Sequence, residues 1–210
     1  MSEKPLRING GVIIFGRLGE RNLFFLCDES VVKMTDTDRK KWDSRYLKDL
    51  GGGEPSGLLK AFYGLASQKK ALDIACGNGR NSLFLAQKGF EVDAIDISQV
   101  ATDHLVQQDP RIKVICRDLD KWAIPENRYG LILNLRFLDK RLFPMILKGL
   151  EPGGILIFES FVGKKHQDYC LEPNELLHAF ISCKIVYYEE KKIDASEKFD
   201  QTVSLVAIKK

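Results

Sequence analysis

The fold is decided by one stretch of this chain of 210 residues, Leu72-Asp73-Ile74-Ala75-Cys76-Gly77-Asn78-Gly79-Arg80-Asn81-Ser82. A carboxylate, Asp73, stands inside a short apolar run, and two glycines follow in the turn that opens a helical segment. Glycine permits a positive φ and a close approach of a ligand to the main chain, and free N–H groups at a helix start offer donors. A dinucleotide-binding turn would continue as Gly-x-Gly-x-x-Gly, but Ser82 takes the third position. The stretch therefore predicts a ligand-binding turn, and it argues against a nicotinamide-dependent enzyme.

Short apolar runs alternate with helical segments on both sides of this turn. The expected strands are residues 71–75, 90–95, 112–116, 131–135 and 155–158. The expected helices lie around residues 83–86, ending at Gly89, and over residues 99–108 and 140–150, the last ended by Pro152-Gly153-Gly154. This repetition predicts right-handed parallel crossovers and an α/β, doubly wound, mostly parallel sheet with helices on both faces.

The C-terminal part of the chain no longer alternates short apolar runs with helical segments. A helix is expected over residues 174–180, followed by β-rich segments at residues 183–188 and 202–208 that charged residues join. Two such segments predict a terminal hairpin, which adds an antiparallel strand to the sheet.

The first 37 residues follow another pattern. Apolar runs at residues 12–15 and 23–27 are joined by a Gly-rich polar turn over residues 16–22, which predicts a β-hairpin. A lone hairpin is marginally stable, so it must pack on the rest of the chain or on a second subunit. We therefore expect a hairpin-like extension over residues 1–37, which could serve a homodimer, and one domain over residues 38–210.

Two helices are expected between this extension and the decisive turn. The first covers residues 36–50 and carries Trp42, Tyr46 and Leu50 on one apolar stripe. The second begins after Ser56, a candidate N-cap, and runs to Leu65.

Polar residues follow the other expected strands. Asp96 ends the second strand, Asp118 follows the third, and Asn134-Leu135 ends the fourth. Ligands of open α/β sheets bind outside the carboxyl ends of the strands, where the strand order reverses. A carboxylate at Asp96 can accept two hydrogen bonds from a ribose diol, and Asp118 then lies where an adenine amino group would arrive.

These positions together resemble a known family. The matching features are Asp73-x-x-x-Gly77-x-Gly79, Asp96, Asp118 and the turn Pro152-Gly153-Gly154. The chain resembles the class I S-adenosylmethionine-dependent methyltransferases, and more narrowly their small tellurite-resistance and thiopurine-type group. The resemblance implies a Rossmann-like sheet of seven strands and S-adenosyl-L-methionine as the cofactor.

The resemblance also implies roles at the methionine end of that cofactor. Gly77 and Gly79 would pack against the methionine part, and Ala75 in the same turn belongs to this site. Asp73 would be oriented toward the amino group, and the backbone of Asn134 would approach the methionyl portion. On its residues alone, Asp73 could instead be a buried carboxylate satisfied by nearby backbone donors.

At the adenosine end, Asp96 would hold the ribose and Ile97 would touch the adenine face. Asp118 and Leu119 would read the adenine. The segment Trp42-Asp43-Ser44-Arg45-Tyr46 resembles the lid helix of the group, so Trp42 and Tyr46 would close over the site, although both could equally be core contacts of an amphipathic helix.

Methyl transfer is an in-line displacement from a sulfonium, so the protein supplies mainly proximity, alignment and exclusion of water. No residue is singled out as a base, and no metal site is expected. The chain lacks an Asn-Pro-Pro-Tyr element after the fourth strand and has Asn134-Leu135-Arg136-Phe137 there. That departure argues against transfer to the amino groups of adenine, cytosine or glutamine.

The composition of the chain limits which binding partners and which cellular locations are expected. The chain has 32 Lys and Arg against 29 Asp and Glu, a net charge of +3, which disfavours a binder of nucleic acid. Its five cysteines have no Cys-x-x-Cys spacing, and neither a signal peptide nor a membrane span is expected, so the prediction is a cytoplasmic protein. The leading hypothesis is a methyltransferase acting on a small molecule; the alternative is a non-catalytic S-adenosylmethionine sensor or interaction module on the same fold.

Overall fold

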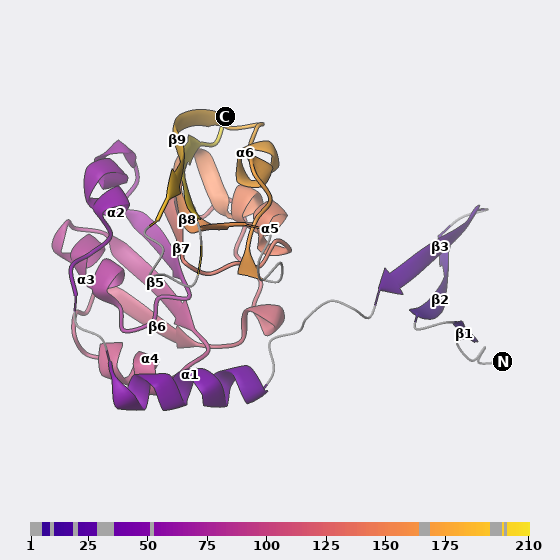
Figure 1. The fold of residues 1–210 in the computed structure, drawn as a ribbon, viewed down its shortest axis with the longest axis horizontal. Coiled ribbons are helices and arrows are strands. Elements are labelled where there is room, and N and C mark those ends of the chain that lie inside the picture. The colour runs from indigo at the N-terminus through magenta and orange to yellow at the C-terminus, as the bar shows by residue number, and fades with distance from the viewer. Residues whose placement is uncertain are drawn as a thin grey trace. The chain divides into compact units, whose positions relative to one another are not determined.

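The computed structural model describes residues 6–8, 11–18, 21–28, 36–50, 53–163, 169–193, 199 and 201–210 (Figure 1). The chain divides into two compact units, Met1–Met34 and Thr35–Lys210. Among the described helices, none combines the length and the apolar character that a membrane crossing requires.

The first unit is an antiparallel sheet in the order β1-β2-β3. Its strands are β1 (Leu6–Ile8), β2 (Gly11–Leu18) and β3 (Arg21–Asp28). The register of β2 and β3 runs from Gly11 opposite Asp28 to Leu18 opposite Arg21. The expected polar turn over residues 16–22 is therefore too long, because the ladder continues to Leu18 and resumes at Arg21.

The second unit is built on a sheet of seven strands in the order β6-β5-β4-β7-β8-β10-β9. The strands are β4 (Lys70–Ile74), β5 (Glu91–Asp96), β6 (Ile112–Cys116), β7 (Tyr129–Leu135), β8 (Leu150–Val162), β9 (Lys184–Lys192) and β10 (Gln201–Ile208). Strands β4 to β8 pair in parallel, and β10 pairs antiparallel with both β8 and β9. The predicted fold class is confirmed, including the antiparallel C-terminal strand.

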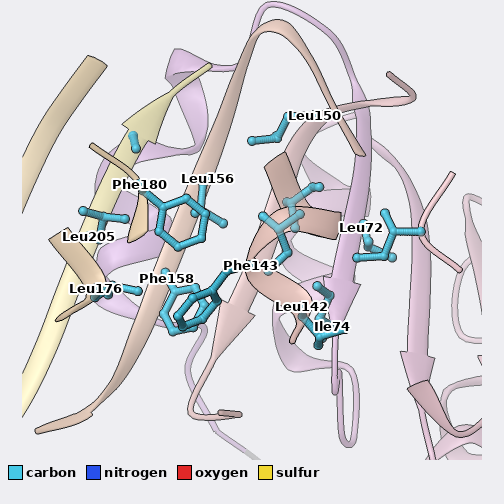
Figure 2. Packing of buried hydrophobic residues seen from close by; sticks show 14 of the residues in the cluster. Leu72, Ile74, Leu142, Phe143, Leu150, Leu156, Phe158, Leu176, Phe180 and Leu205 are labelled. Atoms are coloured by element: carbon cyan, nitrogen blue, oxygen red, sulfur yellow. The ribbon is translucent and has the colours of Figure 1, made fainter. Parts of the chain in front are cut away.

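Helices cover both faces of this sheet. The helices of this unit are α1 (Asp36–Lys48), which lies at the end of the sheet, and α2 (Gly57–Phe62), α3 (Arg80–Gln87), α4 (Gln99–Leu105), α5 (Leu142–Gly149) and α6 (Glu175–Ala179), with short 3-10 turns η1 (Tyr63–Leu65) and η2 (Leu119–Lys121). One buried cluster joins α2, α3 and α4 to the sheet, and the other joins α5 and α6 to its opposite face. In Figure 2, Phe143 of α5 stands against Phe158 of β8, with Phe180 nearby; the ring centroids of Phe143 and Phe158 are 5.8 Å apart.

Several expected boundaries were wrong. The Pro152-Gly153-Gly154 turn does not end a helix, because β8 already begins at Leu150 and contains it. Ser56 makes no side-chain cap of α2; instead its backbone N–H donates to Asn81 Oδ1 at 3.0 Å. Helix α1 ends at Lys48, so Leu50 does not extend its apolar stripe.

Candidate functional site

The site is organised by the turn after β4. Strand β4 lies between β5 and β7, which is the point where the strand order reverses and where ligands bind in open α/β sheets. Ala75, Gly77 and Gly79 all have positive φ, at 53°, 56° and 81°. The turn is tied to the neighbouring strand, because the Cys76 N–H donates to the Ile95 carbonyl at 3.0 Å. Ala75 is the strained member, since only glycine adopts this region without steric cost.

The two glycines have different close neighbours. A Cβ on Gly77 would lie 2.6 Å from the hydroxyl of Tyr46, so this glycine admits a group approaching from outside the turn. A Cβ on Gly79 would lie 2.3 Å from Leu105 Cδ1, so the nearest group to Gly79 is a side chain of α4. Within the chain, Gly79 therefore serves the packing of α3 against α4.

Asp96, at the end of β5, is bound to the glycine turn. Its Oδ2 accepts the Gly77 N–H at 2.9 Å, and its Oδ1 accepts the Ser98 N–H at 2.8 Å. Burial raises the pKa of this carboxyl, and the backbone donors of Ser98 and Gly77 oppose the rise. Each oxygen keeps a further lone pair, so the carboxylate can still accept hydrogen bonds from a diol.

Asp73, in β4, is wholly enclosed and paired with a hydroxyl. Ser82 Oγ of α3 donates to Asp73 Oδ2 at 2.7 Å. Burial raises the pKa of Asp73 from 3.8 to about 7, partly offset by this hydrogen bond. The sequence placed Ser82 beside the turn only as a departure from a dinucleotide motif; the structure shows it as the partner of Asp73.

Helix α1 lies across the carboxyl end of the sheet beside α4 (Figure 1). Trp42 and Tyr46 are both half-buried on it, with ring centroids 6.1 Å apart. Burial, followed by the charge of Asp96, raises the pKa of Tyr46 to about 12, so the hydroxyl stays protonated. The structure thus brings Tyr46 to the glycine turn, and Trp42 lies beside Tyr46 on α1.

Sequence reasoning missed the residue that anchors α1. Asp43 Oδ1 accepts the Ser98 hydroxyl at 2.6 Å and the Val100 N–H at 3.3 Å, at the start of α4. Ser98 in turn caps α4 through the Ala101 N–H. The only signal was the position of Asp43 between Trp42 and Tyr46, which a stripe of apolar residues does not reveal.

The predicted adenine-reading residues lie beside Asp96. Strands β5 and β6 pair through Asp96 and Cys116, and Asp118 follows two residues later as the N-cap of η2, accepting the Asp120 N–H at 2.9 Å. Ile97 and Leu119 are both buried. These strand ends are therefore adjacent in the sheet, as the sequence predicted.

Asn134 is separated from Asp73 by the sheet itself. It pairs with Ile74 of β4 and Phe158 of β8, and side chains alternate along a strand, so its amide shares the α5 face with those residues. Asp73 points to the α3 face, where it meets Ser82. Asn134 is fully buried, and neither its Nδ2 nor its Oδ1 has a hydrogen-bond partner within the described part of the chain. The sequence predicted only a backbone role for this residue.

The charges of the site favour a cationic ligand. Asp73, Asp96 and Asp118 are buried, and none has a lysine, arginine or histidine within 4 Å among the residues that the structure describes. Buried carboxylates are costly unless a positive charge or hydrogen bonds compensate them. S-adenosylmethionine carries an ammonium, a sulfonium and a ribose diol, so these residues fit it.

Comparisons with known proteins agree with this geometry. Residues 71–154 match the model of a methyltransferase domain. The domain contains the glycine turn, Asp96, Asp118 and Asn134. The predicted resemblance to class I S-adenosylmethionine-dependent methyltransferases is thereby confirmed.

Two curated proteins show the same relationship. A ubiquinone biosynthesis O-methyltransferase of Coxiella burnetii is 30% identical over 101 residues, which is 44% of this chain and 43% of that protein. The probable S-adenosyl-L-methionine-dependent methyltransferase TehB of Haemophilus influenzae is 30% identical over 94 residues, 41% of this chain and 32% of that protein. The chain thus spans less than half the length of these relatives.

Solved structures share the fold. TehB from Haemophilus influenzae has a TM-score of 0.66 at 19% identity, over 80% of this chain and 67% of that one. A 1,6-didemethyltoxoflavin-N1-methyltransferase of Burkholderia thailandensis, solved with that compound and S-adenosylhomocysteine, has a TM-score of 0.61 at 15% identity over 99% of each chain. The Rossmann-like architecture of the second unit is therefore shared with these proteins.

Proposed function

We propose that this protein transfers a methyl group from S-adenosylmethionine to a small-molecule acceptor. The observation that carries the proposal is the Asp96 carboxylate, which is buried, fixed by the Gly77 N–H, and without a cationic partner among the described residues. Its place at the carboxyl end of β5, next to the strand β4 at which the strand order reverses, supports a nucleoside ligand. The methyltransferase domain matched by residues 71–154 supports the same ligand.

When bound, the cofactor supplies the methyl group from its sulfonium. Once the methyl group is transferred, the sulfonium has become a neutral thioether, which departs. The residues of the chain bind the cofactor and orient it. Asp96 would hold the ribose diol, with Ile97, Asp118 and Leu119 around the adenine. At the other end, ionised Asp73 would compensate the positive charge of the amino group through the glycine turn.

Helix α1 would exclude water from the reaction. Tyr46 already lies against Gly77, and Asp43 fixes the helix to the start of α4. A methyl transfer by in-line displacement gains most of its rate from alignment and desolvation, so a lid with these contacts suits it. An acceptor that reacts as a thiolate or another soft anion needs no base. An acceptor group whose pKa is higher must lose its proton first and therefore needs a base.

A small acceptor is supported by the charge and by the relatives. A net charge of +3 provides little attraction for a nucleic-acid backbone. The names of two similar proteins refer to small molecules, ubiquinone biosynthesis in one and 1,6-didemethyltoxoflavin in the other. The free thiols of Cys76, Cys116 and Cys183 support a reducing, cytoplasmic location.

The test uses S-adenosylmethionine labelled with tritium in the methyl group. The full chain is incubated with an extract fractionated by mass, and label should appear in the low-mass fraction. Label in protein or nucleic acid instead would contradict the small acceptor. Tight cofactor binding with no transfer to any fraction would favour the alternative, a non-catalytic sensor.

The division of the chain suggests a role for its first unit. We propose that residues 1–37 form an extension that mediates a homodimer, while residues 38–210 form the methyltransferase domain. A two-stranded hairpin is only marginally stable alone, and β1 adds a strand of just three residues to β2 and β3, which supports a partner for this sheet. Light scattering should give a dimer for the full chain and a monomer after removal of residues 1–34. A monomeric mass for the full chain as well as for the shortened chain would contradict the proposal.

A further inference from the structure

Ser98 is hydrogen-bonded to two carboxylates that belong to different parts of the candidate site. Its backbone N–H donates to Asp96 Oδ1 at 2.8 Å, and its hydroxyl donates to Asp43 Oδ1 at 2.6 Å. Asp96 ends β5 and is the expected ribose ligand, whereas Asp43 lies in the middle of α1. Ser98 itself is fully buried, with an exposed fraction of 0%. One fixed residue therefore joins the lid helix to the carboxylate of the ribose site.

The proton of the Ser98 hydroxyl is committed to Asp43 by the other contacts of this residue. Ser98 is the N-cap of α4, and its Oγ accepts the Ala101 N–H at 3.2 Å. A hydroxyl has one proton to donate, and Asp43 takes it in a short bond to a charged acceptor, which is the stronger kind of hydrogen bond. The Ser98 carbonyl also accepts the Thr102 N–H at 3.1 Å. Ser98 is thus fixed through both its side chain and its main chain.

Helix α1 has little apolar packing to hold it in place. None of its residues, all of which the structure describes, is buried. Little apolar area is therefore removed from water, so the polar contacts of Asp43 matter for the attachment of α1 to α4. Asp43 Oδ1 accepts the Val100 N–H as well, at 3.3 Å. Tyr46 follows Asp43 by three residues and lies on the same side of the helix, so the anchor at Asp43 also keeps the Tyr46 hydroxyl against Gly77.

We propose that Ser98 and Asp43 are positioning residues that couple the closure of α1 to binding of the cofactor ribose at Asp96. The inference rests on the proposed methyl transfer. With α1 in place, the Ser98 N–H is held where it orients the Asp96 carboxylate for the diol. When Asp43 leaves, the Ser98 hydroxyl loses its charged acceptor, the start of α4 loosens, and Asp96 loses a fixed donor. Coupling between two sites is reciprocal, so a bound ribose also holds α1 closed.

Substitutions at position 43 separate the hydrogen bond from the charge. Burial raises the pKa of Asp96, and the nearby charge of Asp43 raises it further, so the two carboxylates also act on each other electrostatically. Asp43→Asn removes this charge and keeps an oxygen that can accept the Ser98 hydroxyl, whereas Asp43→Leu removes both. Ser44→Leu is the matched control, because Ser44 is the next residue of the same helix and is exposed.

The test compares adenosine with 2′,3′-dideoxyadenosine, which lacks only the two ribose hydroxyls. Binding of each nucleoside to the full chain is measured by saturation-transfer NMR titration. In the wild type and in Ser44→Leu, adenosine should bind about tenfold or more tightly, because the dideoxy compound cannot donate to a carboxylate. In Asp43→Leu this ratio should fall to about threefold or less, and in Asp43→Asn it should stay within about twofold of the wild type.

The ratio of the two affinities distinguishes coupling from simple coverage. A lid that only covers the cofactor would weaken both nucleosides equally, so an unchanged ratio in Asp43→Leu overturns the proposal. Loss of the ratio in Asp43→Asn as well would overturn it too, because the hydrogen bond would then not carry the coupling. A wild type that binds neither nucleoside, or both equally, has the same consequence.

Hydrogen exchange provides the reciprocal arm. Saturating S-adenosylhomocysteine should slow amide exchange over α1 about tenfold in the wild type and less than about twofold in Asp43→Leu. Equal slowing in both proteins would contradict the coupling. Asp43 is only half-buried, so Asp43→Leu should fold. Ser98→Ala repeats the test from the other side, because it removes the hydroxyl and keeps the N–H that Asp96 accepts.

Cofactor binding separates this inference from the proposed function. If S-adenosylhomocysteine does not bind the wild-type chain, the proposed function fails and the coupling fails with it. If S-adenosylhomocysteine binds and the nucleoside ratio is the same in the wild type and in Asp43→Leu, only the coupling fails.

Discussion

The hydroxyl of Tyr46 lies 2.6 Å from the position that a Cβ on Gly77 would occupy. Residue 77 is therefore glycine for two reasons, its φ of 56° and the lid side chain above it. Helix α1 and the glycine turn are separated by about thirty residues of chain, yet they are fitted to each other. We therefore expect cofactor affinity to depend on α1.

Gly77→Ala should reduce S-adenosylhomocysteine affinity by about tenfold or more and destabilise the fold by about 1–3 kcal/mol. The new methyl group would displace Tyr46 and strain the turn. Gly89→Ala is the control, since Gly89 has a φ of 84° and nothing within 4 Å of its Cβ position. Calorimetry and urea unfolding of both variants separate the steric effect from the backbone effect. Equal affinities in the two variants would contradict the lid contact.

Asp96→Ala should weaken S-adenosylhomocysteine by more than about tenfold, which corresponds to about 1.4 kcal/mol or more. It removes the carboxylate that holds the Gly77 and Ser98 N–H groups. Asp93→Asn serves as the control on the same strand. Asp93 is also buried, but it pairs with Lys70 and Tyr129, so this variant should lose stability and keep its affinity. An Asp96→Ala protein with normal affinity would remove Asp96 from the site.

The stability of the protein should fall as pH rises through about 7 because of Asp73. Its folded pKa of about 7 lies above the ordinary 3.8, so folding favours the protonated form. This contribution is fully present below pH 3.8 and is lost as pH rises through about 7, at no more than about 1.4 kcal/mol per pH unit. Urea unfolding between pH 5 and 8 should show a steeper fall for the wild type than for Asp73→Asn, which keeps an acceptor for Ser82. Parallel curves would contradict the raised pKa.

Ala75→Gly should stabilise the protein by about 0.5–1 kcal/mol. The φ of 53° costs about 1–2 kcal/mol for alanine, and glycine relieves this strain. About half of the relieved free energy is lost again because glycine has greater conformational freedom in the unfolded chain. Ala86→Gly, in the buried part of α3, should destabilise by about 1 kcal/mol and provides the comparison. A thermal or urea denaturation series measures both. Destabilisation at both positions would argue against strain in the turn.

The sequence was sufficient for the sheet and for the strand ends, for a physical reason. Buried parallel strands read as continuous apolar runs, and the polar residues that end them, such as Asp96 and Asp118, stand out against those runs. The antiparallel tail was equally visible, because β9 and β10 are separated by charged residues. Boundaries were less accurate where tertiary contacts decide them, as at Leu150, which pairs with Tyr129 before the glycines of β8.

The rest of the site depends on contacts between distant parts of the chain. Asp43 acts on Ser98, 55 residues away, and nothing in a helical stripe indicates that pairing. The opposite faces of Asp73 and Asn134 follow from strand register, and the missing partner of the Asn134 amide appears only once its neighbours are placed. The sequence showed Ser82 only as the residue in place of a third glycine, and it did not indicate the hydrogen bond from Ser82 to Asp73.

The most direct test of the central claim is a calorimetric titration of S-adenosylhomocysteine, and separately of S-adenosylmethionine, into the full chain. We expect one site per chain with a dissociation constant below about 1 mM, an affinity that corresponds to about 4 kcal/mol. Absence of binding by both ligands at that concentration would contradict the proposal that Asp73, Asp96 and the glycine turn form a site for S-adenosylmethionine.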